Sequence, residues 1–163
     1  MLEPAATPTA TRDLTITRIF DAPRALVFKM WTDPQHIVQW WGPHTFTNPV
    51  CEMDVRPGGK IRIVMRGPRG TNFDMDFPMS GTFHEVVPNK RLVFTAVAED
   101  KDGNPHLKAH TTVIFEDEGD KTKLILRVGA VGFSSAAPQM LTGMDAGWTQ
   151  SLDKLAALVA CSV

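Results

Sequence analysis

Histidine and carboxylate residues with spacings that could support chemistry are few in this sequence. His106 and His110 are four residues apart, and on a strand their side chains would share a face but lie about 13 Å apart. Zinc ligands lie about 2 Å from the metal, so this pair cannot share one ion. His84 and Glu85 are adjacent and would point to opposite faces of a strand. We therefore predict no metal site and no cofactor.

Signatures of nucleophilic catalysis and of phosphate binding are missing from the sequence. There is no G-x-S-x-G motif, no recognisable Cys/His pairing and no Gly-rich phosphate loop. The run Pro57-Gly58-Gly59 is typical of a turn. Asp54 and Arg56 would share one strand face, where they could form a structural ion pair or a polar anchor for a ligand. We predict no catalytic residues, and an enzymatic role is the less favoured interpretation.

Aromatic residues form the most distinctive pattern. The stretch WTDPQHIVQWWGP holds three of the four tryptophans of the chain. We predict that Trp31 belongs to the core. Trp40 and Trp41 are adjacent and would point about 100° apart on a helix, so one of them is expected to face a cavity mouth or a partner. Trp148 lies near the C-terminus and is either a pocket wall or core filling.

A second apolar pattern occupies alternate positions between Phe73 and Phe83. Period two places these phenylalanines and methionines on one face of a long strand, where they form core or a compliant ligand wall, because thioethers adapt to irregular apolar shapes. Methionines in the C-terminal segment would face this wall. The candidate ligand-binding residues are Trp40, Trp41, Met75, Phe77, Met79, Phe83, Phe94, Met140, Met144 and Trp148.

Composition and charge exclude several classes of partner. The chain has 163 residues with 17 basic and 18 acidic side chains, so it has no basic field that would bind nucleic acid. No signal peptide is recognisable, and no uncharged apolar stretch approaches the ~18 residues of a membrane span. Cys51 and Cys161 are far apart and are predicted to be free thiols. We expect a cytoplasmic protein with no membrane or nucleic-acid partner.

The elements that must position these residues follow from hydrophobic periodicity. Residues 1–12 are rich in Ala, Thr and Pro and are predicted to be a flexible tail, with a single domain over 13–163. A strand, then two short helices separated by Asp33-Pro34, should open the domain. Period two from Phe46 to Gly132 predicts about six strands. Apolar residues at helical spacing from Met140 to Val159 predict one helix of about six turns.

This order of elements predicts an α+β fold, because strands in one block favour an antiparallel sheet. One helix is narrower than such a sheet, so the sheet must curl around it to bury its apolar face. Curling of this kind can leave a space between the sheet and the helix.

Four segments resemble, in this order, the family of activator of heat-shock protein 90 ATPase homologue-like proteins in the START/birch-pollen-allergen (SRPBCC) superfamily. They are PRALVFKMWTDPQHIVQWWGP, CEMDVRPGGKIRI, GTFHEVVPNKRLVFT and GWTQSLDKLAALV. The resemblance covers Leu14 to Ala160 and implies a helix-grip fold. In that fold a curved antiparallel sheet of about six or seven strands wraps a C-terminal helix. The implied cavity lies between them, with its mouth flanked by the short helices and hairpin loops.

The resemblance leaves three functions open. The favoured one is a binding protein for a small hydrophobic or aromatic molecule. The second is a co-chaperone-like interaction module with a chaperone partner and a role in stress response, although the chain has only a short segment where eukaryotic co-chaperones carry a chaperone-binding domain. The third is an aromatase- or cyclase-like enzyme that uses an acid or base such as His84 or Asp76. The chain has no tyrosine, which excludes a Tyr relay. A homodimer is also an open alternative.

Overall fold

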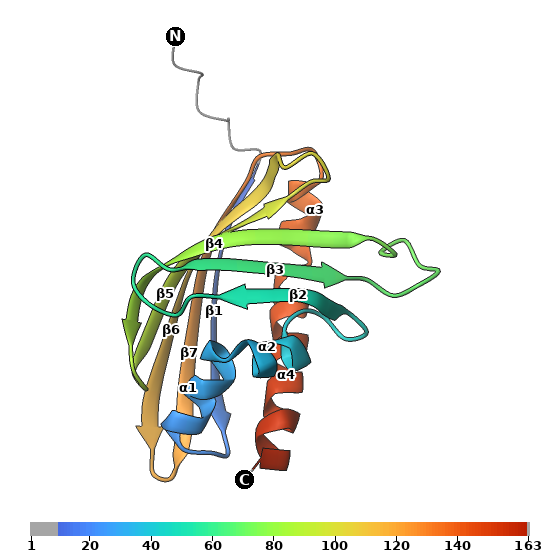
Figure 1. The fold of residues 1–163 in the computed structure, drawn as a ribbon. Coiled ribbons are helices and arrows are strands. Elements are labelled where there is room, and N and C mark those ends of the chain that lie inside the picture. The colour runs from blue at the N-terminus through green and yellow to red at the C-terminus, as the bar shows by residue number, and fades with distance from the viewer. Residues whose placement is uncertain (1–9, 163) are drawn as a thin grey trace.

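The computed structural model describes residues 10–162, which form one seven-stranded sheet with four helices inside its curve (Figure 1). Each neighbouring pair of strands is antiparallel, in the order β1-β7-β6-β5-β4-β3-β2. The strands are β1 (Ala10–Phe20), β2 (Thr47–Met53), β3 (Lys60–Arg66), β4 (Asp76–Val87), β5 (Arg91–Glu99), β6 (Pro105–Glu118) and β7 (Lys121–Gly132). The predicted α+β helix-grip architecture is confirmed.

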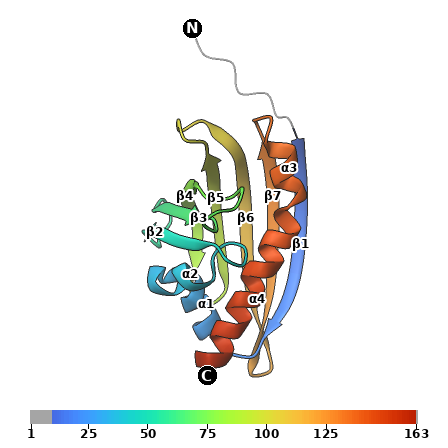
Figure 2. The same ribbon diagram turned by 90° about the vertical axis from the view of Figure 1, so that its right-hand side faces the viewer.

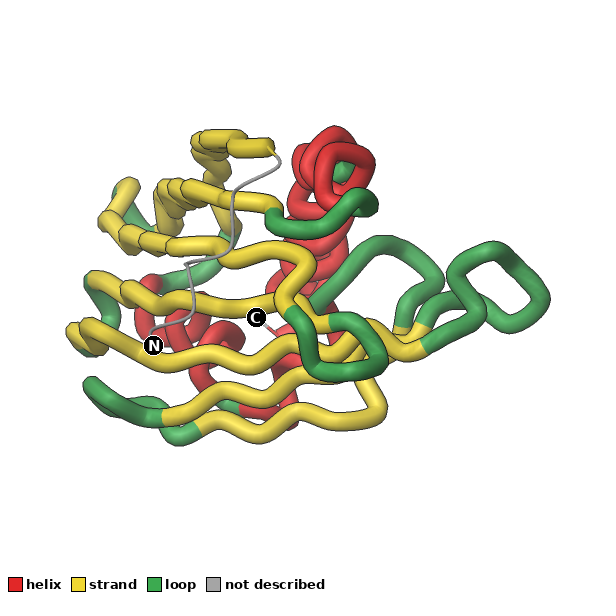
Figure 3. The backbone as a smooth tube through the Cα atoms, turned by 90° about the horizontal axis from the view of Figure 1, so that it is seen from above, coloured by secondary structure: helices red, strands yellow, loops and turns green. Residues whose placement is uncertain are grey.

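The helices lie on the concave side of the sheet, as Figures 2 and 3 show from two further directions. They are α1 (Arg24–Thr32), α2 (Pro34–Trp40), α3 (Ala137–Thr142) and α4 (Met144–Ser162). The helices α1 and α2 lie beside the C-terminal part of α4, and α3 lies at its other end (Figure 1). Helix α4 therefore crosses the concave face, with different neighbours at its two ends.

The first strand begins earlier than the sequence indicates. We expected residues 1–12 to be a tail, but β1 starts at Ala10, and its pairing with β7 continues to Gly132. Arg12 also donates two hydrogen bonds to the carboxylate of Asp145 on α4, at 3.0 and 2.6 Å. Strand pairing and this ion pair explain why residues 10–12 are part of the sheet. The rest of the predicted tail, residues 1–9, lies outside the described residues.

The C-terminal helix is divided, which corrects the prediction of one continuous helix. The division falls at Gly143, between α3 and α4. Glycine is a weak helix former because it has the largest backbone freedom to lose. Met140 therefore lies on α3, whereas Met144 begins α4.

The junction between α1 and α2 depends on a tryptophan. Pro34 has no N–H group, so the carbonyl of Met30 lacks the donor that a continuous helix would supply four residues later. The indole Nε1 of Trp40 donates to that carbonyl at 2.9 Å. Trp40 is fully buried, and its ring lies 4.7 Å from that of Trp31, which is also buried. Trp31 is a core residue as predicted, and Trp40 is a core residue rather than the cavity residue that we expected.

We predict that Trp40→Phe lowers the free energy of unfolding by about 1–3 kcal/mol more than Trp41→Phe does, because only the first change leaves a buried carbonyl without its donor. The indole N–H of Trp41 has no hydrogen-bond partner among the described residues, so Trp41→Phe controls for the smaller ring. Urea denaturation of both variants measures the difference. Equal losses would show that the bond to Met30 contributes nothing.

Candidate ligand-binding site

A row of small residues crosses the inner face of the sheet. The strand register pairs Gly81 with Ala96, Ala96 with Ala109, and Ala109 with Ala130, on the four adjacent strands β4, β5, β6 and β7. None of these residues has a side-chain atom beyond Cβ. The inward row on one side of it carries the larger side chains Phe83, Phe94, Thr111 and Val128, so the small residues form a depression beside that row. The register therefore places a hollow in the middle of the sheet.

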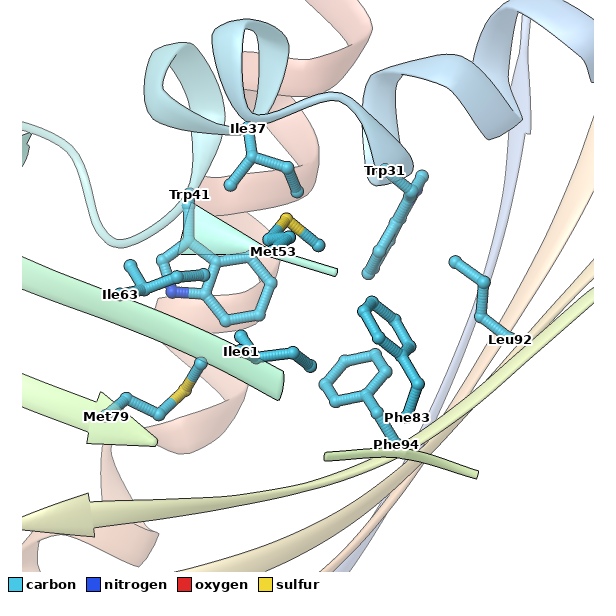
Figure 4. A pocket seen from close by; sticks show the side chains of 10 residues that line it. All are labelled: Trp31, Ile37, Trp41, Met53, Ile61, Ile63, Met79, Phe83, Leu92 and Phe94. Carbon is cyan, nitrogen blue, oxygen red and sulfur yellow. The ribbon is translucent and has the colours of Figure 1, made fainter. Parts of the chain in front are cut away.

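Aromatic side chains fill the inner face next to this row. The rings of Phe83 and Phe94 meet edge to face at 6.0 Å, and Figure 4 shows both converging with Trp31 beneath α1. The space left among the side chains drawn there is about 10 Å³, which is room for about one water molecule. This end of the interior is closely packed core.

On the other side of these rings a cavity of about 270 Å³ lies between the sheet at Ala96 and Ala109 and helices α3 and α4. Its lining comes from the sheet, from both helices and from the segment that follows α2. The lining residues are Trp41, Gly42, Pro43, Met65, Met79, Phe94, Ala96, Ala98, Leu107, Ala109, Thr111, Val128, Met140, Met144, Gly147, Trp148 and Ser151. Nearly all of the atoms that these residues present are apolar.

Two tryptophans separate the cavity from the packed core. Trp148 on α4 stacks on the buried Trp31, with ring centroids 6.1 Å apart and an angle of 19° between the planes. Trp148 also meets Trp41 edge to face at 5.4 Å, and both Trp41 and Trp148 line the cavity. Trp148 therefore contacts the core and the cavity at once, which joins the two roles that the sequence left open.

The segment after α2 forms part of the cavity wall and is attached to α4. Gly42 has a φ of +93°, a conformation that residues with a side chain rarely adopt. The backbone N–H of His44 donates to Gln150 Oε1 at 3.0 Å, and Lys154 Nζ donates to the Pro43 carbonyl at 3.2 Å. Partial burial lowers the pKa of the Lys154 amine. These two hydrogen bonds hold the segment against the helix.

The cavity lining holds no ionisable side chain. Its polar side-chain groups are the hydroxyls of Thr111 and Ser151 and the indole N–H groups, and Ser151 Oγ already donates to the Gly147 carbonyl at 2.9 Å. Among the described residues no group of three His, Cys, Asp or Glu side chains is placed to hold a metal ion. The cavity can therefore hold an apolar molecule by contact and orient it with a few hydrogen bonds.

The acid and base residues considered for an enzyme lie outside the cavity. His84 Nε2 contacts Thr95 Oγ1 at 2.6 Å, and its ring is stacked with His110 at 5.9 Å. His84 is exposed on the outer face of the sheet, because it directly follows the inward Phe83 and successive strand residues point to opposite faces. Asp76 is exposed and accepts from Arg66 Nε at 2.8 Å. Neither His84 nor Asp76 can act on a molecule in the cavity, which corrects that expectation.

The structure brings together part of the predicted ligand-binding set. Trp41, Met79, Phe94, Met140, Met144 and Trp148 line the cavity. Phe83 faces only the closely packed end, and Trp40 is committed to its bond with Met30. Met75 precedes β4 and is 53% exposed, and the ring of Phe77 packs on Phe46 at 5.7 Å instead of reaching the cavity. These two residues miss the cavity because the β3–β4 hairpin extends past the helices (Figure 1).

Sequence reasoning missed the small residues that create the space. The available signal was the inward series of β5, which changes from Leu92 and Phe94 to Ala96 and Ala98 along one strand. On β6, the small Ala109 is the cross-strand partner of Ala96, and Thr111 follows it on the inner face. The predicted ligand contacts were all large residues, whereas the volume of a pocket depends on where side chains are short.

The Asp54–Arg56 pair is structural, as one of our two interpretations predicted. Arg56 Nε lies 2.7 Å from Asp54 Oδ2 at the exposed turn between β2 and β3. The hydrogen bond to Asp54 raises the pKa of the guanidinium. Neither residue belongs to the cavity lining, so the pair does not anchor a ligand there.

Comparison with known proteins identifies the family to which this chain belongs. A sequence profile described as "Activator of Hsp90 ATPase homolog 1-like protein" matches residues 21–160. The chain belongs to this family. No curated protein matches the sequence. Within residues 10–162, no helix is long and apolar enough to cross a membrane.

Several solved structures of other proteins share this fold. The AHSA1 protein of Silicibacter pomeroyi is 28% identical, with a TM-score of 0.75 over 93% of this chain and 100% of that one. A Chromobacterium violaceum protein is 26% identical, with a TM-score of 0.78 over 90% and 96%. CalU16 of Micromonospora echinospora is 27% identical, with a TM-score of 0.62 over 91% and 76%.

The two free thiols of this AHSA1-like chain should differ in reactivity. Burial, with a smaller contribution from Glu52, raises the pKa of Cys51 to about 11, whereas Cys161 is exposed. A raised pKa keeps the thiol protonated and unreactive at about pH 8. We expect iodoacetamide to modify Cys161 first, as followed by mass spectrometry, and Cys51 only after unfolding. Rapid alkylation of native Cys161→Ser at Cys51 would contradict this.

Proposed function

We propose that this protein binds a small, uncharged, apolar or aromatic molecule between strands β5 and β6 and helix α4. One observation carries the proposal: Ala96 and Ala109, in the middle of the row of small residues, line a cavity of about 270 Å³ whose lining has no ionisable side chain. This volume is close to the lower end of the ~300–1,000 Å³ that is typical of small-molecule pockets.

The energetics of packing support this proposal. Side chains around an unfilled space lose dispersion contacts that a packed core would make. A flat apolar molecule would supply those contacts to Trp41, Trp148 and the surrounding methionines. Thioethers adapt to irregular apolar shapes, and four methionines line the cavity, namely Met65, Met79, Met140 and Met144. The lining is therefore suited to ligands that differ somewhat in outline.

A chaperone-interacting role is the second candidate. The family name points to it, and the β3–β4 hairpin exposes two large apolar side chains, Phe73 at 55% and Met75 at 53%. An interaction module of that kind would act through an exposed face. Stimulation of an Hsp90-type ATPase that is lost in Phe73→Ser but retained in Ala109→Leu would favour this role over ligand binding.

We expect the neutral fluorophore N-phenyl-1-naphthylamine to bind saturably, with a change in tryptophan emission, because Trp41 and Trp148 line the cavity. Burial of apolar surface should give a negative heat-capacity change in calorimetry. Contacts without charge should be little affected by salt. The absence of any change in emission or melting temperature, or displacement of the fluorophore by moderate salt, would contradict the proposal.

A matched pair of variants locates the binding. Ala109→Leu should abolish binding and change stability little, because the added atoms enter the existing hollow. Ala130 is 2% exposed and is outside the cavity lining, so Ala130→Leu should lower the free energy of unfolding by about 1–3 kcal/mol through overpacking and still bind. Fluorophore titration and urea denaturation measure both effects. Unchanged binding by Ala109→Leu would place the ligand elsewhere.

A further inference from the structure

Thr111 is buried in the middle of the sheet beside the cavity, and its hydroxyl has no hydrogen-bond partner among residues 10–162. Thr111 lies on β6, is 1% exposed and belongs to the cavity lining. Its side chain makes no hydrogen bond with any other residue that the structure describes. The other buried threonine, Thr122, donates to the Ala22 carbonyl at 2.7 Å, and Ser151 donates to the Gly147 carbonyl. Thr111 therefore departs from the pattern that these two residues follow.

Strand preference alone does not account for a threonine at position 111. Valine has the same branched shape, suits a strand equally well and buries no polar group. A buried hydroxyl without a partner is unfavourable relative to valine. The cross-strand neighbours of Thr111 on the inner face are Phe94 and Val128, which offer no side-chain acceptor. The space next to the hydroxyl is the cavity, so a molecule in the cavity is the partner that the hydroxyl can reach.

We infer that the ligand is an uncharged aromatic compound with a hydroxyl or carbonyl group, which forms a hydrogen bond with Thr111 Oγ1. This inference rests on the proposed function and specifies the ligand class. A threonine hydroxyl both donates and accepts, so phenols and aromatic ketones satisfy it equally. A carboxylate or ammonium group would lose its hydration without gaining a charged partner, because the lining has none. The tryptophan rings form flat walls for the aromatic part.

The inference predicts a specific change in ligand preference. Naphthalene and 2-naphthol share one ring system and differ in a single hydroxyl group. Comparing the affinity ratio of the two probes between the wild-type protein and Thr111→Val cancels their different solubilities in water. We expect Thr111→Val to reduce that ratio about tenfold, or about 1.4 kcal/mol, with naphthalene binding unchanged or stronger. In the wild-type protein, 2-naphthoate should bind more weakly than 2-naphthol.

Two further variants test whether the effect belongs to the Thr111 hydroxyl. Thr122→Val removes a buried hydroxyl that has a protein partner, so it should lower the melting temperature and leave the 2-naphthol to naphthalene ratio unchanged. Thr111→Ser retains the hydroxyl and should retain the ratio. Thr111→Ser also provides a test if Thr111→Val does not fold. Titration of tryptophan emission and thermal melts give both measurements.

The outcomes separate this inference from the proposed function. If the wild-type protein binds both probes and Thr111→Val changes both affinities equally, the inference about Thr111 is overturned and the proposed function stands. Tighter binding of 2-naphthoate than of 2-naphthol would likewise overturn the uncharged ligand class. If the wild-type protein binds none of the probes and N-phenyl-1-naphthylamine also fails to bind, the proposed function is overturned together with the inference.

Discussion

The strand register that aligns Gly81, Ala96, Ala109 and Ala130 across four strands is the constraint on which the rest of the structure depends. Ala96 and Ala109, in the middle of this row, line the cavity, whereas Ala130 at its end is packed in the core. Since a one-residue slip would turn every inward side chain outward, the hollow and the core are specified by the same register. A cavity of this kind is part of how the sheet is packed rather than a surface feature added to it.

The packing beneath α1 and α2 depends on the need of one backbone carbonyl for a hydrogen-bond donor. Proline at position 34 leaves the Met30 carbonyl without a helical donor, and the indole of Trp40 meets that need. Trp40 in turn packs on Trp31, and Trp31 stacks on Trp148. The tryptophan cluster thus ends at the wall of the cavity. Aromatic packing closes the cavity at this end, and Thr111, for which we infer a polar contact with the ligand, lies beside that boundary.

Local patterns in the sequence were sufficient to predict the architecture. Period-two alternation, turn residues and helical spacing each depend on neighbours along the chain, and the predicted order of strands and helices is confirmed. The division of the C-terminal helix was missed because it depends on the single residue Gly143. The start of β1 at Ala10 was missed because it depends on pairing with β7 and on the ion pair between Arg12 and the distant Asp145. The change to alanine along β5 was visible in the sequence, but the alignment of small residues across strands was missed because it depends on the cross-strand register. Trp40 and Met75 were wrongly assigned to the cavity. Trp40 is instead bonded to the backbone carbonyl of Met30, and Met75 lies on a hairpin that extends beyond the helices (Figure 1).

The most direct test of the cavity is a methyl NMR titration of protein labelled with ¹³C at its alanine methyl groups. The account predicts that addition of 2-naphthol shifts the methyl signals of Ala96, Ala98 and Ala109, which line the cavity. The signal of Ala22, which is buried just before α1 and is outside the cavity lining, should stay unchanged. Shifts confined to residues outside the cavity, or no shift at a concentration that saturates the fluorescence change, would contradict the claim that the small-residue row holds the ligand.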